Sequence, residues 1–169
     1  MEDTKGSPKD SLVSRILLFD LFVSEKYKKY SYHLSQLALI ITGFLAFNLI
    51  GESATIFSGT FVLDNLGSTF KVFVLGFSVI ALVYSRQYLL VHELLRNEYF
   101  ILALMSILGM MVMISGHSLL TLYLGLEIMS LSLYALIATA RDRAFAIEAA
   151  LKYFVLGAIA SGLLLYGMS

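Results

Sequence analysis

The sequence predicts an all-α, polytopic bundle of transmembrane helices. Hydrophobic residues make up 59% of the 169 residues and charged residues only 14%, against roughly 45–50% and about 25% in soluble domains. The apolar residues fall into runs close to the roughly 20 residues that a helix needs to cross a bilayer. Lysines and arginines fall on alternate connections between these runs. Together these observations predict about five full spans after a shorter first helix.

The chain begins with a polar stretch that we expect to be disordered. Residues 1–11 contain the only proline and several charged residues, a composition that buries too little apolar surface to order itself. Residues 12–24 are apolar, but Arg15 and Asp20 interrupt them, and the run is too short to cross a bilayer. We interpret residues 12–24 as the end of an incomplete first helix, in a chain truncated at both ends.

Five longer apolar segments follow, each of about 18–25 residues: 31–51, 66–85, 99–116, 118–140 and 144–168. The first and third have no charged residue, and the second contains only Lys71. The fourth contains Glu127, and the fifth contains Glu148 and Lys152. Because helices satisfy their own backbone polar groups in lipid, residues 12–169 are predicted to form one transmembrane helical domain.

Basic residues orient the predicted bundle. The second connection, residues 52–65, and the fourth, around His117, have no lysine or arginine. The first, third and fifth connections have Lys26, Lys28, Lys29, Arg86, Arg96, Arg141 and Arg143. Because cytoplasmic connections are rich in lysine and arginine, these three are predicted to face the cytoplasm or the mitochondrial matrix. We therefore expect a multi-pass protein of the bacterial, or mitochondrial, inner membrane.

Composition excludes several kinds of site. The absence of cysteine excludes thiolate-held iron–sulfur clusters, zinc–thiolate sites and disulfides. His33, His92 and His117 are scattered along the chain, without the spacing of metal ligands. The net charge of zero gives no reason to expect nucleic acid as a partner. We therefore expect the chain to bind no cofactor or metal and to have no catalytic residue of its own.

Glu127 is the first candidate functional residue. It is the only charge between Ser118 and Ala140, about ten residues and roughly 15 Å from the outer end of its helix. An ionisable group at that depth is costly, which favours a function in moving protons or ions. The structural alternative is a protonated glutamate that only hydrogen-bonds a neighbouring helix.

Lys152 is the second candidate, nine residues after Arg143 and roughly 13 Å deeper in the membrane. A desolvated lysine can lose its proton reversibly, as a relay requires. Alternatively, Lys152 reaches the inner surface with its long stem or pairs with Glu148 one turn earlier. Lys71 is a weaker candidate because it, too, can reach an interface. His117 is either interfacial or placed at a proton exit.

Two blocks of sequence resemble subunit N, also called chain 2, of the proton-pumping NADH:quinone oxidoreductase (respiratory complex I). They are LYLGLEIMSLSLYALIA at residues 122–138 and IEAALKYFVLGAIASGLLLYGMS at 147–169. ILLFDLF at 16–22 and LDNLGSTFKVFVL at 63–75 resemble earlier segments of that subunit. The resemblance covers most of the chain after the polar tail.

The resemblance implies an antiporter-like fold of inverted repeats and a proton half-channel coupled to electron transfer from NADH to quinone. Glu127 matches the family's intramembrane glutamate, and Lys152 matches a membrane lysine of this subunit. The implied partners are the other membrane subunits, the lipid bilayer and protons. NADH, FMN, iron–sulfur clusters and quinone belong to other subunits. Family members are much longer, so this chain is expected to lack the helices that carry the partner lysines.

Two other functions are compatible with the same residues. A related cation/proton antiporter, or a hydrogenase membrane subunit, would use Glu127 and Lys152 in the same way with a different energy source. A structural membrane scaffold would use both residues only for helix packing. Neighbouring genes or co-purifying subunits would distinguish an antiporter or hydrogenase subunit from a subunit of complex I. Normal assembly and normal proton pumping by a Lys152→Met variant would favour the structural scaffold.

Overall fold

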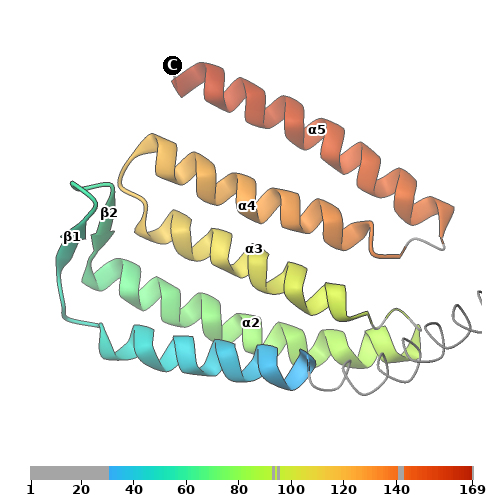
Figure 1. The fold of residues 1–169 in the computed structure, drawn as a ribbon, viewed down its shortest axis with the longest axis horizontal. Helices are drawn as coiled ribbons and strands as arrows, with labels where there is room; N and C mark the ends of the chain where they lie inside the picture. Colours follow the sequence, from blue (N-terminus) through green and yellow to red (C-terminus); the bar gives the residue numbers. More distant parts are fainter. Residues whose placement is uncertain (1–30, 93, 95, 141–142, 169) are drawn as a thin grey trace, which may run out of the picture.

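The computed structural model describes residues 31–92, 94, 96–140 and 143–168. Residues 31–48 form a helix, followed by α2 (Asn65–Val91), α3 (Asn97–Ser115), α4 (Leu119–Ile137) and α5 (Ala144–Met168). Within the described part of the chain, α2 to α5 are long and apolar enough to cross a membrane. The helices follow one another side by side in sequence order (Figure 1). The predicted all-α membrane fold is confirmed.

The helix α2 is longer than its apolar run. It continues to Val91, past the predicted end at residue 85, because its last turns still pack against the bundle. Leu82 and Leu89 are buried on one face, and the Arg86 guanidinium lies 4.4 Å from the centre of the Tyr32 ring. A cation over an aromatic face is favourable, so Arg86 does not end the helix. The predicted helix 12–24 and polar tail 1–11 lie outside the described residues.

A β-hairpin connects helix 31–48 to α2. Its strands, β1 (Ala54–Ile56) and β2 (Phe61–Leu63), are antiparallel, with Thr55 opposite Val62. Positive φ angles of 53° at Phe57, 55° at Ser58 and 87° at Gly59 reverse the chain. The sequence alone predicts only a connection here, so the hairpin is a finding of the structure.

The hairpin also holds the connection between α3 and α4. Phe61 pairs with Gly116 across the two connections, and the His117 backbone N–H donates to the Thr60 carbonyl at 3.0 Å. The second and fourth connections therefore lie together at one end of the bundle (Figure 1). This arrangement agrees with the alternation of basic residues, which predicts that both connections face the same side of the membrane.

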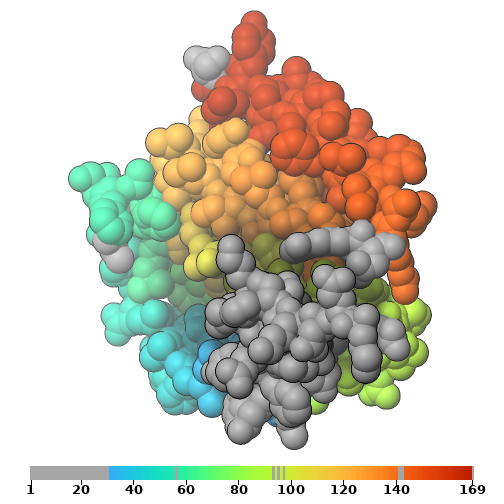
Figure 2. All heavy atoms as spheres, turned by 45° about the vertical axis from the view of Figure 1, so that its right-hand side comes forward, coloured from blue at the N-terminus to red at the C-terminus, as the bar shows by residue number. Residues whose placement is uncertain are grey.

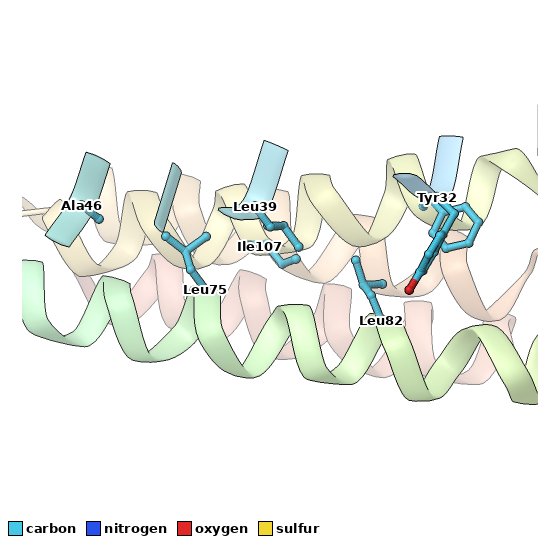
Figure 3. Packing of buried hydrophobic residues seen from close by; sticks show 7 residues of the cluster. Tyr32, Leu39, Ala46, Leu75, Leu82 and Ile107 are labelled. Atoms are coloured by element: carbon cyan, nitrogen blue, oxygen red, sulfur yellow. The ribbon is translucent and has the colours of Figure 1, made fainter. Parts of the chain in front are cut away.

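The hydrophobic core lies between helix 31–48, α2 and α3. Figure 3 shows Leu39 from the first helix and Leu75 from α2 near Ile107 of α3. Phe100 of α3 is fully buried beside Tyr32, with their ring centres 5.6 Å apart. Buried leucine and aromatic side chains thus hold these three helices together.

Glycines bring α3 and α4 into close backbone contact. A Cβ atom added at Gly109 would lie 2.6 Å from the Met129 backbone nitrogen and 2.7 Å from the Gly125 carbonyl oxygen. A Cβ added at Gly125 would lie 2.9 Å from the Met113 backbone nitrogen. Small residues are the usual means by which membrane helices approach this closely. The helices α3 and α4 are therefore closely packed, and this packing fixes the position of α4, the helix that contains Glu127.

Asp64 caps the start of α2. Its side chain accepts a hydrogen bond of 2.9 Å from the Gly67 backbone N–H. We expect Asp64→Ala to lower the free energy of unfolding by about 1 kcal/mol, because a backbone donor in the first turn loses its cap. Asp64→Asn keeps an acceptor and should cost only a fraction of that. Thermal unfolding of the purified protein in detergent checks both, and equal losses for the two variants would contradict the capping role.

Candidate functional site

Glu127 lies at the middle of α4, eight residues after Leu119 and ten before Ile137. It is half-buried rather than exposed. The hydroxyl of Ser161 on α5 donates a hydrogen bond to Glu127 Oε1. The carboxyl group therefore lies at the contact between α4 and α5. The structure thus gives this mid-helix carboxyl group a polar protein partner on the neighbouring helix.

Ser161 has a second polar neighbour, Tyr123. The Ser161 Oγ atom lies 3.2 Å from the Tyr123 hydroxyl oxygen. Tyr123 is four residues before Glu127, so the two side chains share one face of α4. Neither Tyr123 nor Ser161 was among the residues predicted to act at the site. The spacing of Tyr123 and Glu127 is visible in the sequence, but their common partner depends on how α4 and α5 pack.

The α4 helix has two distinct packing faces. Thr121, Gly125 and Ser132 are buried, and Gly125 contacts α3. Tyr123, Glu127 and Tyr134 recur at the four- and seven-residue spacing of a different face, which contacts α5. Small and hydroxyl residues thus fit α4 closely to α3, and larger polar residues face α5.

Tyr134 and Gly157 fix how α4 lies on α5. The Tyr134 ring meets the Tyr153 and Phe154 rings edge-on, with centres 4.8 and 5.7 Å apart. A Cβ atom added at Gly157 would collide with the Tyr134 hydroxyl group. Because only glycine leaves room for this ring, the Tyr134–Gly157 contact sets the helix spacing at which Ser161 meets Glu127. Figure 2 shows α5 (red) at one edge of the molecule, on α4 (orange).

Lys152 lies on the other side of α5. Its Nζ atom is 2.6 Å from Glu148 Oε1, and the two side chains are 72% and 63% exposed. Lys152 and Ser161 are nine residues apart, and at about 3.6 residues per turn this spacing places them on opposite faces of the helix. The structure therefore shows the Glu148–Lys152 pair that the sequence offered as an alternative. It does not bring Lys152 to Glu127.

The weaker candidates lie at the hairpin end. Lys71 is half-buried on α2 and lines a mostly apolar cavity of about 330 Å³ with Leu45, Phe61 and Ser115. His117 is exposed in the connection between α3 and α4. Within residues 31–92, 94, 96–140 and 143–168, no three histidine, aspartate or glutamate side chains gather in a way that would hold a metal ion.

Known proteins match this chain over nearly its whole length. A family model described as NADH:quinone oxidoreductase/Mrp antiporter, TM, matches residues 116–169, the part with Glu127 and Lys152. NADH-quinone oxidoreductase subunit N of Ruthia magnifica is 66% identical over 160 residues, which cover 94% of this chain and 33% of the relative. The subunit of the same name from Alkalilimnicola ehrlichii is 50% identical over 155 residues, or 91% of this chain and 32% of the relative.

A solved structure agrees with these relatives. A chain of respiratory complex I from Thermus thermophilus, determined with bound aureothin, superposes with a TM-score of 0.70 and 29% identity. The match covers 91% of this chain and 33% of that one. The chain thus spans about a third of the length of the relatives it matches. The predicted family resemblance is confirmed, and with the apolar helices it identifies a multi-pass inner-membrane protein.

Proposed function

Because the chain corresponds to about a third of NADH-quinone oxidoreductase subunit N, we propose that it forms part of a proton half-channel of that complex. Electron transfer from NADH to quinone on other subunits would supply the energy. The chain is then part of an enzyme but not catalytic alone, and NADH, FMN, iron–sulfur clusters and quinone bind elsewhere. Its partners are the other membrane subunits, the lipid bilayer and the transported protons.

The observation that carries this proposal is the position of Glu127. A carboxyl group at mid-membrane depth is expensive unless its surroundings are polar or it has a use. Glu127 lies between two helices and accepts a hydrogen bond from Ser161. A carboxyl group accepts a proton as the carboxylate and donates one as the acid. We infer that Glu127, held at the contact between α4 and α5, takes up and releases a proton during translocation.

Lys152 would act as a second proton carrier or coupling base on the far face of α5. Glu148 is its partner in this structure, so the state of that ion pair would decide whether Lys152 keeps its proton. Since Lys152 faces away from Glu127, protons would pass between them through water or through groups outside this chain. We assign Lys71 and His117, both at the hairpin end, subsidiary places on the outer side of the pathway.

Lys152→Met tests this assignment. In the full-length subunit within the assembled complex, we expect fewer protons pumped per electron, because methionine keeps the apolar stem but carries no charge. Assembly should be normal, because the Glu148–Lys152 ion pair joins two residues of the same helix and does not hold two helices together. Lys152→Arg is the control, because arginine keeps the positive charge but does not readily lose its proton. This variant should assemble normally but should not pump at the full rate. Normal pumping by Lys152→Met would favour a purely structural role.

A further inference from the structure

Ser161 has one hydroxyl hydrogen but lies within hydrogen-bond distance of two oxygen atoms. Its Oγ atom contacts Glu127 Oε1 and lies 3.2 Å from the Tyr123 hydroxyl oxygen. A serine hydroxyl donates one hydrogen bond and accepts others, so it cannot donate to both neighbours at once. The three groups must therefore form a chain of hydrogen bonds that runs in one direction or the other.

Resting on the function proposed above, we propose that Tyr123 and Ser161 are positioning residues that hold Glu127 in both of its protonation states. When Glu127 is a carboxylate, the Tyr123 hydroxyl donates to Ser161, and Ser161 donates to Glu127. When Glu127 is a carboxylic acid, its own O–H donates to Ser161, and Ser161 donates to Tyr123. Both hydroxyl hydrogens rotate, and no proton leaves either hydroxyl group.

This arrangement addresses a difficulty that any buried proton carrier meets. A carboxylate accepts hydrogen bonds, whereas a carboxylic acid must also donate one. A fixed donor, such as a backbone N–H group, satisfies only the first of these states. Hydroxyl groups donate and accept, so the Tyr123–Ser161 pair satisfies both without moving a helix. An unsatisfied polar group in the membrane is costly, and a hydroxyl pair that serves both states avoids this cost whether or not Glu127 carries its proton.

Contacts around the site hold Tyr123, Ser161 and Glu127 in their relative positions. The Tyr134 hydroxyl group lies against Gly157, which is one helical turn from Ser161 on α5. The close backbone contact at Gly125 holds α4 against α3. The charged pair of α5, Glu148 and Lys152, is exposed on the opposite face. Among the residues that the structure describes, the hydroxyl pair provides the polar partners of Glu127 at the α4–α5 contact.

Difference infrared spectroscopy of the assembled complex with full-length subunit N tests this role. The band of protonated Glu127 is first identified by its disappearance in Glu127→Gln. Ser161→Ala should move this band to higher wavenumber, because the carboxyl group loses its hydrogen-bond partner. Tyr123→Phe should move it less in the same direction, because Ser161 remains but loses its own acceptor. Ser161→Thr restores a hydroxyl group and should restore the band.

The outcomes separate this proposal from the function on which it rests. An unchanged Glu127 band in both Ser161→Ala and Tyr123→Phe would overturn the positioning role. Should Ser161→Ala prevent assembly, Tyr123→Phe still tests the proposal, since it removes only the hydroxyl group and keeps the aromatic ring. Normal pumping by Glu127→Gln would contradict the proposed function. The band shifts in Ser161→Ala and Tyr123→Phe would still test the hydrogen-bond chain.

Discussion

Replacing Glu127 with glutamine should abolish most of the proton translocation through this half-channel and leave the complex assembled. Glutamine has nearly the same shape, and its side-chain oxygen can still accept the hydrogen bond from Ser161. It cannot take up or release a proton. Removal of a positioned proton-transfer group typically slows the dependent step by about 100-fold or more. The measurement is the number of protons moved per NADH oxidised in sealed vesicles.

Two variants make this experiment specific. Glu127→Asp keeps the carboxyl group on a side chain shorter by one methylene and should retain part of the activity. Glu52→Gln changes an exposed glutamate before β1 and should pump normally. Normal proton translocation by assembled Glu127→Gln would show that the carboxyl group only holds α4 against α5.

The largest effect on stability is expected at the contact between α3 and α4. Alanine at Gly109 would place a Cβ atom 2.6 Å from the Met129 backbone nitrogen, a distance that forces the two helices apart. Overpacking of this kind costs about 1–3 kcal/mol. The intrinsic preference of helices for alanine over glycine acts in the opposite direction, by about 1 kcal/mol. A net loss of stability would therefore show that the steric clash outweighs this preference. Thermal unfolding of the subunit in detergent measures this loss.

Gly76 of α2 provides the matched control. A Cβ atom added there has no heavy atom within 4 Å outside its own stretch of helix. Gly76→Ala should therefore be as stable as the native protein or more stable. If Gly109→Ala unfolded at the same temperature as Gly76→Ala, α3 and α4 could not be as close as the structure places them.

Much of the fold is predictable because the bilayer imposes simple rules. A long apolar run with at most one charge satisfies its backbone in lipid by forming a helix, which is why the segments at residues 99–116 and 118–140 match α3 and α4 closely. Counting residues along the apolar run that becomes α4 is also enough to place Glu127 at mid-helix. The length of a helix and the position of a residue along it thus depend on one segment alone, so they can be predicted from the sequence.

Contacts between segments were not predictable in the same way. The α3–α4 contact depends on Gly109 meeting Gly125, and nothing in either helix alone pairs these two glycines. The partner of Glu127 is Ser161 rather than Lys152 because a nine-residue offset turns Lys152 to the opposite face of α5. The β-hairpin depends on pairing of Phe61 with Gly116, far away in sequence. Each of these features requires the relative rotation of two elements.

Glu127 is expected to change its protonation state while the complex works. Time-resolved infrared difference spectra of the assembled complex during NADH oxidation test this most directly. We predict a carboxyl band that rises and falls with turnover in the native complex and is absent from Glu127→Gln. A Glu127 band that stays constant from rest through steady turnover would contradict its role as a proton carrier.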